Sequence, residues 1–185
     1  MGDIRSLDVF LPKLIEQGSG HIVNIASGAG IFGATEPLPY VTSKFGVVGL
    51  SEALFGQLGV FNIKVSVVVP FYIKTGIYQK TQVRYLPKLI EDVGRGKLEE
   101  ISKSLLNEMQ KKAMDVSRAV RKYIRGIKKE ELYIYDSKGI LRTMTLKGSD
   151  PVQFQNFLRN YCKEAETQTR NHFSKYGIDI EKYYK

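Results

Sequence analysis

The chain is almost free of cysteine, and this scarcity excludes two kinds of site. Cys162 is the only cysteine among 185 residues, so the chain has neither a disulfide framework nor a thiolate metal site. Histidine is nearly as rare, because only His21 and His172 are present, without the spacing of metal ligands. We therefore predict no metal site. Asn-x-Ser/Thr glycosylation sites are also missing, and together these features favour a reducing, cytoplasmic setting.

Long hydrophobic runs are missing too. No apolar run approaches the roughly 20 residues of a membrane-spanning helix, and the first ten residues lack the basic and then apolar layout of a secretory signal. The composition, 43% hydrophobic and 25% charged, is typical of a globular protein. We therefore expect one domain over residues 1–185 and no transmembrane segment.

Positive charge is in excess, with a formal net charge of +9. Lysine and arginine are spread over residues 74–147 without a compact basic block and interleaved aromatic residues. This spread favours solvated helix faces, and we predict no nucleic-acid partner. A basic α/β protein that binds nucleic acid by charge is kept as an alternative, and strongly salt-dependent affinity would support it.

The first 70 residues alternate between helix and strand patterns. Apolar residues recur at helical spacing over residues 2–17, around Pro12. Short apolar strands are predicted at 21–26 and 63–69, with a charge-poor helix at 40–58 between them. Asn24 is expected to be a structural polar residue near the sheet edge. This rhythm predicts an α/β fold with a doubly wound parallel sheet.

The pattern changes after Pro70. Residues 71–97 read as irregular, and amphipathic helices are expected from Leu98 and after Asp115, which is a suitable N-cap. A last strand is expected at 132–135, followed by a long helix at 150–176 as a C-terminal helical extension. The apolar stripe of this helix, residues 154–165, suits docking on the domain, pairing of subunits or contact with a membrane.

A glycine-rich loop follows the first predicted strand. Gly28, Gly30 and Gly33 spell G-x-G-x-x-G, which is typical of a dinucleotide-binding turn. In such a turn the helix begins within or directly after the glycines. Here Pro37 and Pro39 keep the chain extended until Tyr40, so we predict that this loop does not bind the phosphates.

Ser27, Tyr40 and Lys44 form the most informative constellation. Tyrosine and lysine four residues apart share one helix face, and an ammonium near a phenol favours its phenolate form. Such a tyrosine can exchange a proton with an alcohol or a carbonyl oxygen. Ser27 ends the preceding strand, at the edge where open α/β sheets bind ligands. Tyr-x-x-x-Lys alone arises about once by chance in this composition, but the serine thirteen residues earlier makes the full pattern rare.

With these motifs the sequence resembles the short-chain dehydrogenase/reductase family. GHIVNIAS and the following GAG resemble the strand and serine of that family, YVTSK supplies its Tyr-x-x-x-Lys, and VVVPFYIKT resembles its segment beside the nicotinamide. The resemblance runs from Met1 to about Thr75 and returns weakly near ISKSLL and LYIYD. It implies part of a Rossmann-type doubly wound sheet and an enzyme that uses NAD or NADP to interconvert an alcohol and a ketone or aldehyde.

The resemblance also assigns roles to residues. Tyr40 would be the acid/base, Ser27 would orient the substrate oxygen, and Lys44 would favour the phenolate and bind the nicotinamide ribose. The cofactor would also meet Pro70, Ile73 and Thr75, of which the last two would touch the carboxamide. Gly28 would let the backbone run close to the substrate.

Two departures from the family pattern limit the resemblance. Phe71 stands in place of the glycine that follows the proline in the family, and it adds bulk beside the nicotinamide. The phosphate-binding first half of the family has no counterpart, so we expect the chain to be incomplete and inactive alone. The alternative is a catalytically inactive fragment or pseudoenzyme that serves as an interaction module.

The resemblance further implies how the substrate and the subunits would be held. The family places a lid at residues 77–112, where apolar residues favour an apolar alcohol or ketone as substrate, although ordinary core is the competing interpretation. These residues are Tyr78, Val83, Tyr85, Leu86, Leu89, Ile90, Leu98, Ile101 and Leu105. Helices 2–17 and 40–58 would form a homo-oligomer.

Overall fold

A computed structural model describes residues 2–33, 35–77 and 83–184. The elements, in chain order, are α1 (Gly2–Gln17), β1 (Gly20–Ile25), the 3₁₀ turn η1 (Gly28–Gly30), α2 (Leu38–Leu58), the 3₁₀ turn η2 (Gly59–Phe61), β2 (Ile63–Val69), α3 (Pro87–Val93), α4 (Arg95–Lys111), α5 (Val116–Lys128), β3 (Tyr133–Tyr135), α6 (Lys138–Ser149), α7 (Pro151–Ser174) and η4 (Glu181–Tyr183). They group into two compact units. Unit 1 comprises Met1–Phe71 and Ser117–Phe154, and unit 2 comprises Tyr72–Val116 and Gln155–Lys185.

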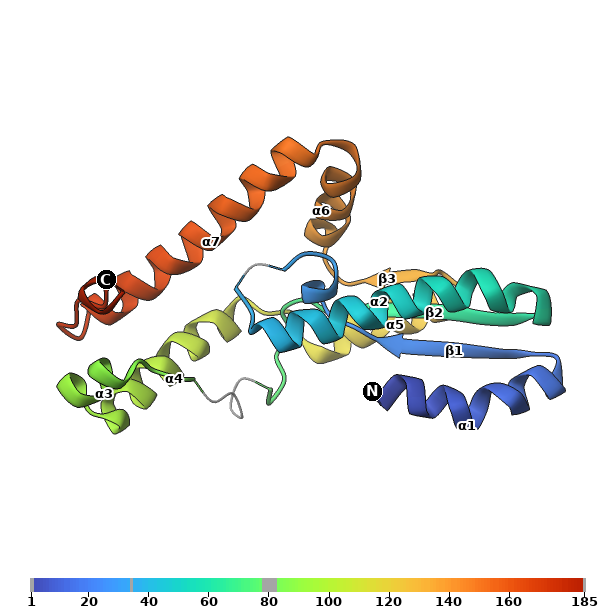
Figure 1. Cartoon of the computed structure of the whole chain (residues 1–185), viewed down its shortest axis with the longest axis horizontal. Helices are drawn as coiled ribbons and strands as arrows, with labels where there is room; N and C mark the ends of the chain where they lie inside the picture. The colour runs from blue at the N-terminus through green and yellow to red at the C-terminus, as the bar shows by residue number, and fades with distance from the viewer. Residues whose placement is uncertain (1, 34, 78–82, 185) are drawn as a thin grey trace. The chain divides into compact units, whose positions relative to one another are not determined.

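Unit 1 contains a parallel sheet with strand order β1-β2-β3 (Figure 1). Ile22 of β1 is in register with Val65 of β2, and Val68 of β2 is in register with Ile134 of β3. The valines and isoleucines of β2 suit a strand that is buried on both faces. The predicted α/β fold with a parallel sheet is therefore confirmed.

Helices cover both faces of this sheet. Alternate residues of a strand point to opposite faces, and Ile63 and Val65 pack with Leu54 and Leu58 of α2 in a cluster that leucines of α1 complete. The other face meets α5. A Cβ atom on Gly126 would lie 2.7 Å from the Ile134 side chain, so this glycine lets α5 approach the sheet closely. The arrangement is that of a doubly wound sheet.

Polar side chains inside unit 1 are paired with each other. Asn24 of β1 donates to the Ser51 hydroxyl of α2 at 2.9 Å, which gives it the structural role that we predict. The His21 ring lies 2.8 Å from the hydroxyl of Ser66, which donates to the carbonyl of Glu131. These bonds satisfy groups that would be costly to bury unpaired, and His21 serves the sheet.

Unit 2 is built around an apolar cluster. Leu98 and Ile101 of α4 are fully buried, and they pack with further buried residues from α3, α7 and the C-terminal stretch, namely Leu89, Phe173, Ile178 and Ile180. These positions follow the helical spacing of an amphipathic α4. The side chains that cover this cluster therefore come from both ends of the unit's sequence.

The structure corrects several element boundaries. Residues 71–97 are not wholly irregular, because α3 begins at Pro87 and α4 already begins at Arg95. Proline suits the first turn of a helix, where its missing N–H has no partner to lose. Likewise, α2 begins at Leu38 rather than at Tyr40. Helix α6 has no counterpart among the predicted elements, while the single domain over 1–185 stays a prediction.

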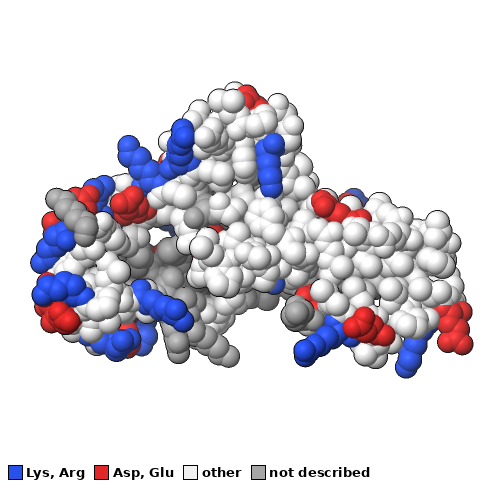
Figure 2. Space-filling model, viewed as in Figure 1, with Lys and Arg blue, Asp and Glu red and all other residues white. Residues whose placement is uncertain are grey.

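Charge is unevenly distributed over the two units. The only charged residues in α2 are Lys44 and Glu52, and Figure 2 shows few charged side chains over this helix. Apolar side chains are exposed there instead, including Phe55 at 47%. None of the helices in the described ranges combines the length and the apolarity needed to cross a membrane.

Candidate active site

Ser27 lies at the carboxyl edge of the sheet in unit 1. The chain continues beside β2 after β1 ends, because the amide of Ala26 donates to Val68 O and that of Gly28 to Pro70 O, both at 2.8 Å. Ser27 is half-buried and extended, and its hydroxyl accepts a hydrogen bond from the amide of Ala29 at 3.2 Å as the cap of η1. The serine is thereby fixed at the strand tip. Its hydroxyl hydrogen remains available for another acceptor.

Tyr40 and Lys44 lie on the first turns of α2. The Lys44 ammonium donates to the carbonyl of Ile25 at 3.0 Å and lies 5.8 Å from the centroid of the Tyr40 ring. Ile25 is the last residue of β1, so the lysine joins the start of α2 to the strand end that precedes Ser27. The structure thus brings the lysine to the tyrosine ring and to this edge of the sheet.

The glycine-rich loop packs closely against its neighbours. A Cβ atom would lie 2.6 Å from the Lys44 carbonyl oxygen if placed on Gly30, and 2.8 Å from the Val41 side chain if placed on Gly33. Real Cβ contacts are not this short, so the glycines allow the loop to approach α2. The helix begins only at Leu38, beyond the loop, which differs from a phosphate-binding turn.

Phe71 forms the other side of this edge. Its ring lies 6.4 Å from that of Phe32, centroid to centroid, and a Cβ atom on Gly28 would lie 2.7 Å from the Phe71 ring and 3.0 Å from the Ile140 side chain of α6. The bulk expected from Phe71 is therefore present, and it packs on Gly28. The resulting wall beside Ser27 is apolar.

Sequence reasoning missed Asp136. This residue directly follows β3 and is buried, with only 3% of its surface exposed. Its carboxylate accepts hydrogen bonds from the Phe71 amide at 3.1 Å and from the Tyr123 hydroxyl. Burial raises the pKa of Tyr123, and the hydrogen bond to Asp136 raises it further. A polar residue at the end of a predicted strand was the only available signal.

Ile73 and Thr75 belong to unit 2. Ile73 forms an isolated parallel bridge with Met114, and the carbonyl of the exposed Thr75 accepts a hydrogen bond from the Gln110 side chain at 3.2 Å. Their position is thus described relative to α4 and not relative to Ser27, Tyr40 or Lys44. Pro70 remains in unit 1, where its carbonyl binds Gly28.

The predicted lid is largely a core. Leu89, Leu98 and Ile101 are buried in the apolar cluster of unit 2, against which Tyr85 and Ile90 also pack. The Tyr85 hydroxyl donates to the Leu98 carbonyl at 2.9 Å. The competing interpretation, ordinary core, therefore describes these residues, whereas Tyr78 lies outside the described residues.

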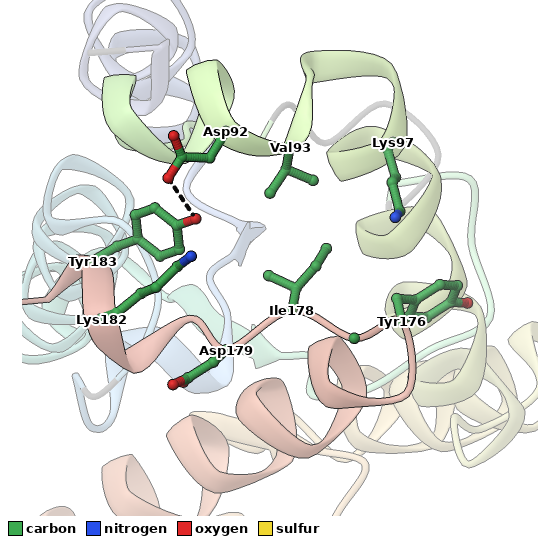
Figure 3. Close-up of a pocket in the computed structure, with 9 residues that line it drawn as sticks. Asp92, Val93, Lys97, Tyr176, Ile178, Asp179, Lys182 and Tyr183 are labelled. Carbon is green, nitrogen blue, oxygen red and sulfur yellow. Dashed lines mark hydrogen bonds between the residues drawn. The ribbon is translucent and has the colours of Figure 1, made fainter.

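A second hollow lies wholly within unit 2 (Figure 3). Asp92, Lys97 and the C-terminal residues 176–179 and 182–183 line it with Val93. Its one buried lining residue is Ile178, and its charged residues are all exposed. Asp92 is occupied by Lys88 at 2.9 Å and by the Tyr183 hydroxyl at 3.0 Å. These contacts describe a solvated rim around the core and place no reactive group.

Metal ligands do not gather in the described ranges, 2–33, 35–77 and 83–184. No group of three or more histidine, cysteine, aspartate or glutamate residues there could hold a metal ion. Cys162 is exposed. The buried His172 of unit 2 lies 3.2 Å from the Ile101 carbonyl and 3.5 Å from Glu108, so its contacts belong to the core.

Comparison with known proteins identifies residues 2–85 as matching the family model of short chain dehydrogenases. Epidermal retinol dehydrogenase 2 of Mus musculus is 30% identical over 155 residues, which cover 82% of this chain and 43% of that protein. Retinol dehydrogenase 10 of Xenopus tropicalis is 38% identical over 91 residues, which cover 45% and 27% of the two chains. The chain spans less than half the length of these curated relatives.

Solved structures show the same fold. A short chain dehydrogenase/reductase from Burkholderia phymatum, in complex with NAD, superposes with a TM-score of 0.63 at 23% identity over 83% of this chain and 56% of that one. A short chain dehydrogenase from Burkholderia cenocepacia, in complex with NADP, gives 0.61 at 15% identity over 85% and 54%. The predicted Rossmann-type architecture agrees with these structures.

Proposed function

Because this chain belongs to the short-chain dehydrogenase family, we propose that it carries the acid/base site of a nicotinamide-dependent oxidoreductase. The reaction interconverts an alcohol and a ketone or aldehyde. One observation carries the proposal: the Lys44 ammonium lies between the Tyr40 ring and the Ile25 carbonyl, at the sheet edge where Ser27 ends the strand. Open α/β sheets bind their ligands at this edge.

The donors at this edge fit a nicotinamide cofactor. An ammonium carries three hydrogens, and Ile25 O accepts one of them, so Lys44 has hydrogens left for a ribose hydroxyl. Bound NAD or NADP would supply or accept the hydride. We assign Pro70, Ile73 and Thr75 to the same cofactor, and both NAD and NADP remain options because both occur among the structural neighbours.

Tyr40 moves the proton in this proposal. In the reductive direction its hydroxyl donates a proton to the substrate carbonyl oxygen, and in the oxidative direction its phenolate accepts the proton of the alcohol. The positive charge of Lys44 stabilises the phenolate. The Ser27 hydroxyl accepts from Ala29 N and so can donate its own hydrogen to the same substrate oxygen. Gly28 leaves room beside it.

An apolar alcohol is the proposed substrate class. Phe71, Phe32 and Ile140 form an apolar wall at Gly28, and two relatives are named retinol dehydrogenases. An elongated apolar alcohol and its aldehyde suit such a wall through burial of apolar surface. Activity confined to small polar polyols would contradict this assignment.

We also propose a homo-oligomer through α1 and α2. The charge-poor α2 exposes Phe45 and Phe55, and α1 exposes Phe10 at 59%. Exposed apolar side chains that gather on one element mark interaction sites. A cytoplasmic setting remains part of the proposal, and measuring the molar mass in solution tests the oligomer.

Turnover by the natural protein tests the proposed function. We expect oxidation of NADH or NADPH with retinal or another apolar aldehyde, and a loss of kcat on the order of 10²- to 10⁴-fold in Tyr40→Phe. Tyr176→Phe, an exposed position in unit 2, is the matched control and should keep full turnover. Equal turnover of Tyr40→Phe and the wild type would contradict the role of Tyr40, and absence of turnover in the wild type would favour the interaction module.

A further inference from the structure

Asp136 is a buried carboxylate at the end of β3, and the proposed chemistry does not use it. The Phe71 amide and the Tyr123 hydroxyl donate to the same carboxylate oxygen, Oδ2. The Lys122 ammonium donates to the backbone carbonyl of Asp136 at 2.5 Å. A carboxylate that is taken out of water requires such hydrogen bonds to remain there. Asp136 thus joins the ends of β2 and β3 to α5.

The bond to Phe71 acts on the edge that holds Ser27. Phe71 follows Pro70, whose carbonyl accepts the Gly28 amide at 2.8 Å, and the Phe71 ring packs on Gly28. Gly28 is the next residue after Ser27. A continuous series of contacts therefore runs from Asp136 through Phe71 and Gly28 to Ser27, and each of its members belongs to unit 1.

We infer that Asp136 is a positioning residue, which fixes Pro70 and Phe71 against Gly28 and thereby sets where the substrate oxygen lies beside Ser27. This inference rests on the proposed function. Without the Asp136 acceptor, the Phe71 amide and its ring can shift from Gly28. A shift of about 1 Å in the reacting groups is enough to slow a reaction by on the order of 10²-fold.

Tyr123 shows that the acceptor role is persistent. Burial and the bond to Asp136 both raise the pKa of its phenol, so Tyr123 keeps its proton and remains a donor over the working pH range. A phenol and an amide that share one oxygen hold it from two elements, α5 and the end of β2. The oxygen therefore has a defined position relative to both.

Three variants in the natural protein separate positioning from stability. Asp136→Ala removes the acceptor. Asp136→Asn restores an oxygen with two lone pairs at the same place, which can accept both bonds. Ser137→Ala is the matched control, because it removes the cap at the start of α6, where Ser137 Oγ accepts from the Gly139 amide at 3.1 Å, and leaves the bond to Phe71 intact.

Two readouts are measured for each variant, namely kcat and KM per folded molecule and hydrogen exchange of the Phe71 amide. We expect Asp136→Ala to lose about 10- to 100-fold in kcat and the protection of this amide, Asp136→Asn to recover both, and Ser137→Ala to change neither. Wild-type kcat and KM in Asp136→Ala, or an asparagine variant as poor as the alanine variant, would overturn the inference.

The exchange measurement keeps this inference separate from the proposed function. If the wild type shows no turnover, the proposed function fails on its own. Loss of Phe71 amide protection in Asp136→Ala and its return in Asp136→Asn would still support the clamp of Asp136 on this edge. Unchanged exchange in all three variants would overturn the clamp whether or not the enzyme turns over.

Discussion

The two units of the chain are held together in different ways. Unit 1 relies on close approach of backbone segments, as at Gly30 against Lys44 and at Gly126 against β3, together with the hydrogen bonds of a parallel sheet. Unit 2 relies on the volume of buried side chains such as Ile101 and Phe173. The proposed chemistry lies in unit 1, where an added methyl group would displace backbone.

Surface charge differs in the same direction. Unit 2 carries ion pairs at its surface, such as Lys74 with Asp115 at 3.0 Å and Arg170 with Glu181. Exposed pairs of this kind contribute only about 0–1 kcal/mol each, so the apolar cluster provides most of the stability of unit 2. Unit 1 instead exposes the charge-poor surface of α2. The comparison therefore separates a stabilising core from a reactive edge.

The largest expected effect breaks the core of unit 2. Ile101 is fully buried in the cluster, so Ile101→Ala should lower the free energy of unfolding by about 2–5 kcal/mol, through lost transfer energy and the cavity that remains. Urea denaturation measures this loss. The control Ile4→Ala, at a position 50% exposed on α1, should stay within about 0.5 kcal/mol.

This variant also decides between core and lid. If Ile101 serves stability alone, kcat and KM per folded molecule remain at wild-type values in Ile101→Ala. An unchanged free energy of unfolding together with a large rise in the KM for an apolar aldehyde would instead restore the lid interpretation of this residue.

The next effect breaks the close approach in unit 1. In Gly30→Ala the new Cβ would lie 2.6 Å from Lys44 O, so the loop or α2 must move. We expect a loss of about 1–3 kcal/mol in the free energy of unfolding, and a lower kcat because Lys44 moves with its helix. Chemical denaturation and turnover together measure both effects.

A glycine in α2 provides the matched control. A Cβ at Gly49 would have open space within 4 Å, and alanine favours a helix interior by up to about 1 kcal/mol over glycine. Gly49→Ala should therefore stabilise unit 1 and leave kcat unchanged. Equal effects at Gly30 and Gly49 would show that close approach is not what the loop glycine provides.

Sequence patterns predicted unit 1 better than unit 2. The β-branched run of β2 and the helical spacing of α2 are local signals, and both elements lie within two residues of their expected bounds. Ser27 could be placed at the sheet edge because parallel strands end together. The roles of Ser27, Tyr40 and Lys44 stay predictions, supported by the contacts of Lys44.

Other features could not be predicted from the sequence for physical reasons. Apolar residues such as Leu98 and Ile101 show that a helix face is buried, but not whether a substrate or another helix covers it. Asp136 contacts Phe71, which lies 65 positions away in the chain, and no local pattern records such a pair. The glycines of the loop indicated a close approach, but the partner, Lys44 of α2, is visible only in the structure.

The smallest effect sharpens the comparison through pH. In unit 1, burial and then the hydrogen bond to Glu52 raise the pKa of Tyr133. The phenol ionises near pH 10 in the unfolded chain, so its contribution to stability is fully present below about pH 10 and is lost as the pH rises further towards the folded-state pKa. Tyr133→Phe should lower the free energy of unfolding by about 0.5–1.5 kcal/mol at neutral pH. Urea denaturation between neutral and alkaline pH should show this deficit shrinking above about pH 10, because only the wild type loses the contribution. A deficit that stays constant over this range would mean that the raised pKa of Tyr133 does not couple ionisation to the folding of unit 1.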